Sequence, residues 1–265
     1  MKVIKRTSLT ALFEAIAARG YTMVGPVLHD QTIIYEEITS LTDLPVGWTD
    51  EQSGGTYRLR KRDDEALFGY VLGPYSWKRY LYPPRSLLWR GTRNRRGFDI
   101  EDPPKDNKKY AFIGVRPCEL HAILVQDEVF LRGKYVDRLY RSRRRNALLV
   151  VVNCGRAGGT CFCTSMGTGP KADRGFDLAL TEIISTKRHV FTVETGTERG
   201  EDILTSVPCK KSTAADEAAA AATIANAVEQ MGNTFDTTNI NALFLDNYEH
   251  PRWADVEKRC LTCAN

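Results

Sequence analysis

Two stretches of the sequence decide the fold: YAFIGVRPCELHAILVQDEVFL (residues 110–131) and ALLVVVN (residues 147–153). The first six of these residues, 110–115, form a continuous apolar run, which is typical of a strand buried on both faces. Residues 118–131 then place apolar side chains at the spacing of one helical face, and ALLVVVN is a second buried strand. A strand, a helix and a strand in this order predict an α/β unit with parallel pairing.

The residues before this unit predict a small β-rich module over residues 1–100. Thr7 or Ser8 is expected to cap a first helix that ends near Arg19. Strand-like segments follow at residues 21–27, 32–38, 56–61 and 66–73, with turn-forming residues at 44–55. The charged residues 91–109 are interpreted as a connector to the second unit.

Further elements are expected after ALLVVVN: strands at residues 176–183 and 189–196, and helices at residues 210–232, 240–250 and 251–260. Ser212 or Thr213 is expected to cap the first of these helices, which is rich in alanine. We therefore assign residues 110–210 to an α/β unit and residues 211–265 to a helical tail. The predicted fold class is α/β with a mixed sheet, a small β-rich N-terminal module and a helical C-terminal tail.

The composition excludes several classes of protein. A chain of 265 residues that is 42% hydrophobic and 26% charged is not disordered, collagen-like or a coiled coil. The formal net charge of +4 is too small for a protein that binds nucleic acid irrespective of sequence. Basic residues cluster at 57–62, 90–97 and 138–146. These clusters are either solvated surface or a docking face for an acidic partner protein or an anionic cofactor.

The sequence also carries no signal for a membrane or for export. No apolar run approaches the ~18 residues of a membrane-spanning helix, so we expect no membrane span. Glu14 and Arg19 interrupt the apolar stretch near the N-terminus, which excludes an ordinary signal peptide. The expected location is the cytoplasm.

Seven cysteines are unusual for such a chain: Cys118, Cys154, Cys161, Cys163, Cys209, Cys260 and Cys263. Disulfides are rare in the cytoplasm and an odd number of cysteines cannot pair fully, so closely spaced cysteines are interpreted as metal ligands. Cys154 ends one buried strand, and Cys161 and Cys163 follow it in a glycine-rich loop. The backbone amides of such a loop can turn toward a bound group. Cys118 follows the other buried strand.

If the two strands are neighbours, these four thiolates meet at the carboxyl edge of the sheet and can hold a 4Fe-4S cluster. Arg116 is a nearby cation that would partly offset the charge of the cluster. Three alternatives stay open. The first is a four-thiolate zinc site, although the paired C-x2–4-C knuckles of structural zinc are missing. The others are a redox dithiol of Cys161 and Cys163, and a buried core position for Cys118.

Cys260 and Cys263 form a C-x-x-C pair in the final residues, CLTCAN. The pair matches the beginning of the bacterial ferredoxin run, C-x2-C-x2-C-x3-C-P, whose third cysteine falls due one residue after Asn265. We therefore expect the helical tail to lead into a truncated ferredoxin motif. Cys260 and Cys263 are metal ligands only if that motif is completed.

Other residues are weaker candidates for a functional role. His121 lies one helical turn after Cys118 and either lines the site or packs ordinarily. Glu119 is either a proton relay or an exposed cap or ion-pair partner, and Cys209, with no thiol nearby in sequence, is expected to be structural. The aromatic side chains of SWKRYLY are assigned to packing or, alternatively, to a partner contact; they are Trp77, Tyr80 and Tyr82.

Five motifs stand in order along the chain: LFGYVLGPYSWKRYLYPP (67–84), GVRPCELHAI (114–123), NCGRAGGTCFCTSMGTGP (153–170), GFDLALTEI (175–183) and HPRWADVEKRCLTCAN (250–265). Together they resemble the iron–sulfur beta subunits of cytosolic sulfhydrogenases and the related A subunit of anaerobic sulfite reductase. The resemblance implies a subunit of the dicluster 4Fe-4S type that carries electrons between a flavin-bearing, NAD(P)H-linked subunit and a catalytic subunit. Such subunits usually end in a two-cluster ferredoxin domain, which this sequence lacks.

These observations predict an electron-transfer subunit of a multisubunit oxidoreductase that is not catalytic alone. The predicted cofactor is a 4Fe-4S cluster held by Cys118, Cys154, Cys161 and Cys163. The alternative is a scaffold or docking subunit without redox activity, which carries a structural four-thiolate zinc site or none. Motifs for nucleotide, phosphoryl or hydrolytic chemistry (GxGxxG, the P-loop, HExxH and GxSxG) do not occur.

Overall fold

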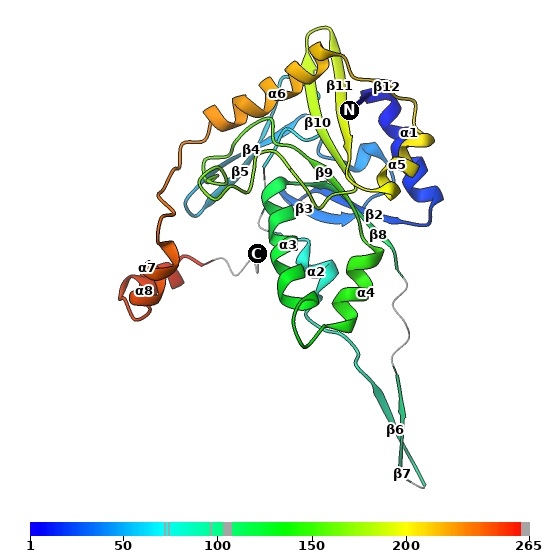
Figure 1. Ribbon diagram of the computed structural model, residues 1–265, viewed down its shortest axis with the longest axis vertical. Helices are drawn as coiled ribbons and strands as arrows, with labels where there is room; N and C mark the ends of the chain where they lie inside the picture. Colours follow the sequence, from blue (N-terminus) through cyan, green and yellow to red (C-terminus); the bar gives the residue numbers. More distant parts are fainter. Residues whose placement is uncertain (72, 74, 96, 103–107, 261–265) are drawn as a thin grey trace.

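A computed structural model describes residues 1–71, 73, 75–95, 97–102 and 108–260 (Figure 1). Within these residues the centre of the molecule is an eight-stranded mixed sheet. The strands lie in the spatial order β12 (Lys210–Lys211), β1 (Lys2–Lys5), β11 (Arg188–Thr195), β10 (Leu178–Ser185), β9 (Leu148–Val152), β8 (Tyr110–Val115), β2 (Thr22–His29) and β3 (Thr32–Glu37).

The middle of the sheet is parallel and its margins are antiparallel. Strand β8 pairs in parallel with both β2 and β9, and β9 pairs in parallel with β10. The pairs β2–β3, β10–β11, β11–β1 and β1–β12 are antiparallel. The predicted fold class is confirmed. Strands β8 and β9 are parallel neighbours, which is the condition under which Cys118 and the cysteines after β9 were expected to meet at one edge of the sheet.

Helices cover both faces of the sheet, and β9 shows how the sequence arranges this. All five residues of β9 are buried. Leu148, Val150 and Val152 pack in the core under α1 (Leu9–Ala18) and α5 (Glu198–Thr205). Leu149 and Val151 pack on the opposite face, under α3 (Pro117–Leu131), α4 (Arg138–Asn146) and α2 (Lys78–Leu81). A strand buried on both faces explains the continuous apolar run.

The N-terminal residues contribute to this same sheet. Strands β1, β2 and β3 come from the first 37 residues. Strand β1 pairs with β11 and β2 pairs with β8, while β3 joins the sheet through β2. The division of the chain into residues 1–100, 110–210 and 211–265 stays a prediction. In the structure, strands from the first of these parts pair with strands from the second, so the sheet crosses the first boundary. A hairpin outside the sheet, β4 (Trp48–Ser53) with β5 (Thr56–Lys61), occupies residues expected to form turns as well as the expected strand at 56–61.

The strand expected at residues 66–73 is wrong for the residues of that range that the structure describes. Carboxylate side chains accept hydrogen bonds from the backbone N–H groups of this segment, which in a sheet would bond to a neighbouring strand. The Glu182 carboxylate accepts from the N–H groups of Leu67 (2.7 Å) and Phe68 (2.9 Å). The Asp50 carboxylate accepts from Val71 N–H (2.7 Å). The apolar composition reflects burial of an irregular segment.

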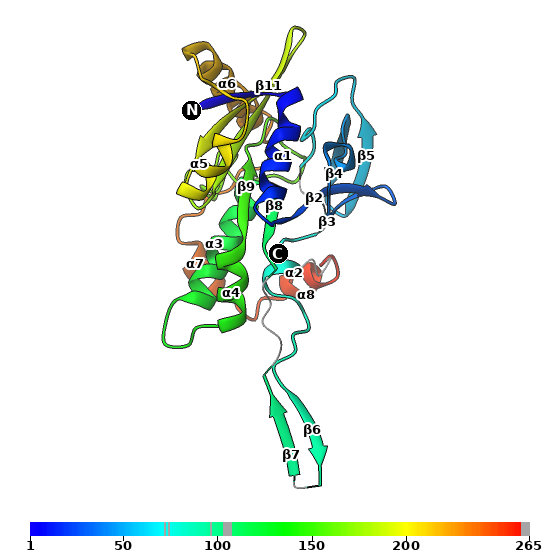
Figure 2. The same cartoon turned by 90° about the vertical axis from the view of Figure 1, so that its right-hand side faces the viewer.

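The connector expected at residues 91–109 contains most of a second hairpin, β6 (Arg90–Asn94) with β7 (Gly97–Glu101). Every described residue of these two strands is exposed. The hairpin projects away from the sheet and its helices (Figures 1 and 2). The expected connector therefore contains regular secondary structure in this part of the range.

The expected C-terminal helices are present with shorter bounds. Thr213 caps helix α6 (Ala214–Glu229), because its side chain accepts from Asp216 N–H, and the helix packs through Ala220 against β10 and β11. Helices α7 (Ile240–Asp246) and α8 (Arg252–Glu257) contain no buried residue. None of the helices in the described part of the chain has the length and apolar character needed to cross a bilayer.

Candidate metal centre

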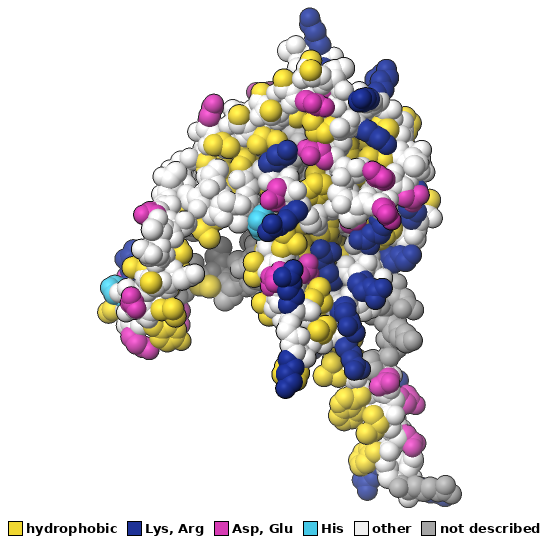
Figure 3. Space-filling view, in the orientation of Figure 1, with side chains coloured by type: hydrophobic (Ala, Val, Ile, Leu, Met, Phe, Trp, Pro, Cys, Tyr) yellow, Lys and Arg dark blue, Asp and Glu magenta, His cyan; other side chains and the backbone are white. Residues whose placement is uncertain are grey.

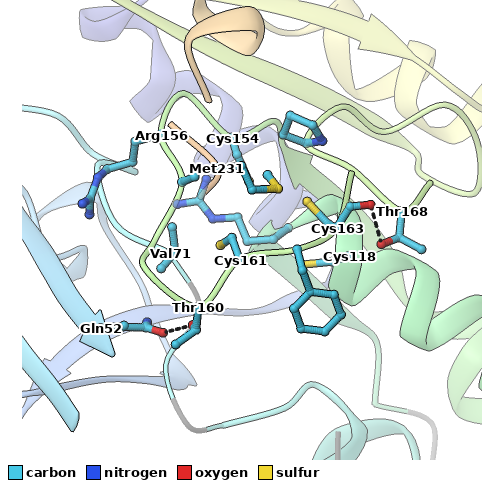
Figure 4. A pocket seen from close by; sticks show the side chains of 14 residues that line it. Gln52, Val71, Cys118, Cys154, Arg156, Thr160, Cys161, Cys163, Thr168 and Met231 are labelled. Carbon is cyan, nitrogen blue, oxygen red and sulfur yellow. Dashed lines mark hydrogen bonds between the residues drawn. The ribbon is translucent and has the colours of Figure 1, made fainter. Parts of the chain in front are cut away.

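Four of the seven cysteines line one cavity of about 290 Å³ (Figure 4). Cys118 is the second residue of α3, directly after β8, and Cys154 follows β9. Cys161 and Cys163 come from the loop after β9. The carboxyl ends of neighbouring parallel strands lie at the same edge of the sheet, so β8 and β9 bring these separate stretches together.

Backbone hydrogen bonds fold the cysteine loop, residues 154–170, back on itself. Cys154 N–H donates to the carbonyl of Pro170 (3.0 Å), and the carbonyl of Cys163 accepts from Thr168 N–H (2.9 Å). Gly158 N–H donates to Cys161 Sγ (3.3 Å), which is the kind of amide–sulfur contact found around metal-bound thiolates. Gly159 lies against the carbonyl of Gln52, where a Cβ atom would overlap the oxygen. The loop therefore requires glycine at that position.

Arg116 forms part of the cavity wall and is only 2% exposed. Its guanidinium donates to the carbonyl oxygens of Phe68 (2.8 Å) and Tyr70 (2.5 Å) and lies 5.0 Å from the centre of the Tyr70 ring. Its Nε is buried and has no hydrogen-bond partner among the described residues. Burial acts to lower the pKa of Arg116, but acidic groups nearby, Cys154 first among them, outweigh burial and raise it. The cavity therefore has a permanent cation in its wall.

The thiols of Cys118, Cys154 and Cys163 are protonated at neutral pH when no metal ion is bound. Burial raises the pKa of Cys118 and Cys163, and raises that of Cys154 to about 11. The proximity of the other acidic side chains adds to this effect in all three cases, while the charge of Arg116 opposes it at Cys154. Because metals bind the thiolate, a metal at this site would have to displace these protons.

Glu119 has a different place from the one expected. It is 2% exposed and accepts hydrogen bonds from Tyr35 Oη (2.6 Å) and from the backbone N–H of Arg116 (2.9 Å). Burial raises the pKa of Glu119 to about 7. It caps the first turn of α3, as one of the alternatives held, but it is buried where exposure was expected, and it does not line the cavity.

The remaining candidates lie away from the cavity or outside the described residues. His121 is not in the cavity wall and lies 4.0 Å from Asp173. Cys209 packs against the hydrophobic core, as expected for a structural cysteine. Cys260 is exposed after α8, and Cys263 lies outside the described residues.

The aromatic side chains of residues 76–82 serve packing. Trp77 is 1% exposed and stacks on Tyr35 with ring centres 3.9 Å apart. Tyr80 contacts Tyr110 and Phe112. Tyr82 is the most exposed of the three and stacks on Phe130.

Several residues of the cavity wall escaped the sequence analysis: Gln52, Val71, Arg156, Thr160, Phe162, Thr168 and Met231. Four of these residues belong to the cysteine loop, and their position close to the cysteines in sequence could have indicated that they line the cavity: Arg156, Thr160, Phe162 and Thr168. Gln52, Val71 and Met231 come from distant parts of the chain and carry no such signal.

The donor set fits an iron–sulfur cluster in its chemistry. Four thiols, an amide that donates to sulfur and a buried cation surround a cavity several times larger than the ~30 Å³ that one water molecule occupies in the liquid. In the described ranges, no three His, Cys, Asp or Glu side chains converge closely enough to hold a single metal ion. The sulfur atoms are instead distributed around the wall of the cavity (Figure 4).

Comparison with known proteins identifies a relative among the sulfhydrogenases. No family model matches the chain. The chain is 29% identical over 159 residues to the protein named sulfhydrogenase 2 subunit beta of Pyrococcus furiosus. The matched residues are 60% of this chain and 39% of the relative, so the match spans about two fifths of the relative's length. The dicluster subtype and the resemblance to anaerobic sulfite reductase stay predictions. The chain is therefore similar to a sulfhydrogenase beta subunit, as its motifs indicated.

Proposed function

We propose that this chain is an electron-transfer subunit of a multisubunit oxidoreductase of the hydrogenase, sulfur-reductase or sulfite-reductase type. In this proposal Cys118, Cys154, Cys161 and Cys163 hold a 4Fe-4S cluster. One observation carries the proposal: four cysteines from two separate stretches line a single cavity at the carboxyl ends of β8 and β9. The similarity to a sulfhydrogenase beta chain supports it.

Each group around the cavity has a role in this proposal. The four thiolates bind iron, and the N–H of Gly158 donates to the sulfur of Cys161 and stabilises its negative charge. Arg116 contributes a positive charge from the cavity wall. The bound cluster would accept and release one electron at a time, which requires no acid–base pair. A cluster takes one thiolate at each iron, so its ligands surround a larger volume than the ligands of one zinc ion.

Exposed apolar side chains support the assignment to a complex. On α7 and α8 the large exposed side chains are Leu243, Phe244, Leu245, Trp253 and Val256, and near the projecting hairpin they are Leu87, Leu88, Trp89, Phe98 and Ile100. Exposed apolar patches are typical of surfaces that contact other proteins. Lys and Arg side chains also gather over α4 (Figure 3), whose sequence is RLYRSRRRN. We propose a flavin-bearing, NAD(P)H-linked subunit and a catalytic subunit as partners, and a cytoplasmic location.

Iron analysis of the protein prepared without oxygen tests the proposal. The chain is reconstituted with ferrous iron and sulfide, and the Cys260→Ser/Cys263→Ser double variant is treated in parallel so that the C-x-x-C pair cannot contribute. Both proteins should be brown, absorb broadly near ~400 nm and contain about four irons per chain. A colourless double variant that retains one zinc per chain would contradict the electron-transfer proposal and support a scaffold with a four-thiolate zinc site.

A further inference from the structure

Arg116 is a buried cation without a carboxylate partner. Its guanidinium donates to the carbonyl oxygens of Phe68 and Tyr70, which are neutral groups. Within the described part of the chain it takes part in no ion pair, and its buried Nε has no hydrogen-bond partner. A buried charge that is not paired destabilises a protein, so a cation in this position calls for an anionic counterpart.

The nearby acid does not supply that counterpart. Glu119 accepts from the backbone N–H of Arg116 and from the hydroxyl of Tyr35, and not from the guanidinium. Arg116 lines the cavity together with Cys118 and Cys154.

We infer that Arg116 is the counter-charge of the metal centre and raises its reduction potential. The inference rests on the proposed function, because it concerns the cluster that the four cysteines would hold. Reduction adds one electron to the centre and forms or breaks no bond, so the centre becomes more negative by one charge. A fixed cation beside the centre stabilises the reduced form more than the oxidised form.

Arg156 supplies a matched control in the same cavity wall. Its guanidinium lies 3.4 Å from the carboxylate of Asp50, which is fully buried, and it also donates to the backbone carbonyl of Asp50 (2.9 Å). The charge of Arg156 is therefore offset by a carboxylate, whereas the charge of Arg116 is not. A comparison of variants that lack one charge or the other therefore distinguishes an arginine that acts on the metal centre through its charge from an arginine that only lines the cavity.

The experiment compares the wild type with Arg116→Gln, Arg116→Lys and Arg156→Gln. Iron per chain is measured first, and the midpoint potential is then determined by an anaerobic dithionite titration in the presence of redox mediators. Arg116→Gln should lower the ratio of reduced to oxidised centre at least tenfold at a given potential, which is a shift of about 59 mV for one electron. Arg116→Lys keeps the charge and should stay within about threefold, and Arg156→Gln should do the same.

The outcomes separate this inference from the proposed function. A wild type that binds no iron contradicts the proposed function. A wild type with about four irons and an Arg116→Gln variant with the same iron content and potential overturns the inference alone. If Arg116→Gln does not retain iron, Arg116→Lys decides: a wild-type potential upholds the inference, and a tenfold fall overturns it. Loss of iron from both variants assigns Arg116 a purely structural role and also overturns it.

Discussion

At the scale of single residues, charged side chains form hydrogen bonds with the backbone beside the cysteine-lined cavity. In a regular sheet, neighbouring strands would form these hydrogen bonds. Glu182 binds the N–H groups of Leu67 and Phe68, and Arg116 binds the carbonyl of Phe68 and that of Tyr70. These contacts bring an irregular segment from the first part of the chain against the cysteine loop. The wall of the cavity therefore depends on buried charges as well as on cysteines.

Replacement of single cysteines tests the ligand set. Cys161→Ser should reduce the iron content from about four per chain to less than about one, because a hydroxyl is a poor substitute for a thiolate at iron. The control is Cys209→Ser, at a partly buried cysteine that packs against the hydrophobic core. It should keep the full iron content, as measured by colorimetric iron analysis after reconstitution. Equal losses of iron in the two variants would refute the assigned ligands.

The sequence predicted the cysteines of the cavity but not the rest of its wall. Short spacing within the loop and the position of Cys118 after a buried strand are local signals, and parallel pairing converts them into proximity. Val71 and Met231 reach the cavity through tertiary packing, which leaves no trace in the spacing of residues. The unpaired state of Arg116 likewise depends on which carboxylates the fold brings near, and only the structure reveals this.

At the scale of elements, α6 shows a helix start that the sequence predicted closely. Thr213, one of the two expected caps, begins the helix, and the Asp216 carboxylate accepts from Thr213 N–H (2.9 Å). Asp216 also pairs with Arg188 on β11. The hydrogen bond from the Thr213 backbone, followed by that from Arg188, lowers the pKa of Asp216 to about 2. The cap therefore also ties the helix to the sheet.

The lowered pKa of Asp216 predicts how stability depends on pH. Its contribution to the free energy of unfolding, about 1 kcal/mol, is fully present above the pKa of an unfolded aspartate, about 4. It is lost as the pH falls through 2, because protonation then removes the charge that the folded state favours. Urea unfolding of Asp216→Asn should therefore show a deficit at pH 6 that shrinks toward pH 2.

Glu217→Gln is the control for that series, because it removes a charge from the same helical turn and leaves the capping carboxylate in place. It should lose less stability at pH 6 than Asp216→Asn does. A deficit of Asp216→Asn that stays constant from pH 6 to pH 2 would show that the carboxylate does not contribute through its charge.

Other elements were predicted less well, for reasons that the structure makes clear. Residues 110–115 and 147–153 were recognised as strands because burial on both faces requires continuous apolar residues. The strands β6 and β7 are wholly exposed, so no buried face marks them in the sequence. Residues 66–71 have the apolar composition of a strand, but carboxylates bind their N–H groups. Composition reports burial, and it does not report which partner binds the backbone.

At the scale of the whole molecule, the chain combines a sheet with a buried core and segments in which no described residue is buried. The hairpin β6–β7 extends from one end of the molecule (Figure 2), and α7 and α8 have no buried residue. A two-stranded hairpin without a covering surface is only marginally stable in water. These parts are consistent with a subunit whose remaining surfaces are completed by other proteins, as we propose.

The most direct test of the metal centre is X-ray diffraction from crystals of the reconstituted Cys260→Ser/Cys263→Ser variant, with data collected on both sides of the iron absorption edge. The account predicts an anomalous peak of about four irons inside the cavity, surrounded by the sulfur atoms of Cys118, Cys154, Cys161 and Cys163. Iron located elsewhere in the molecule, or a single zinc peak in the cavity, would contradict it.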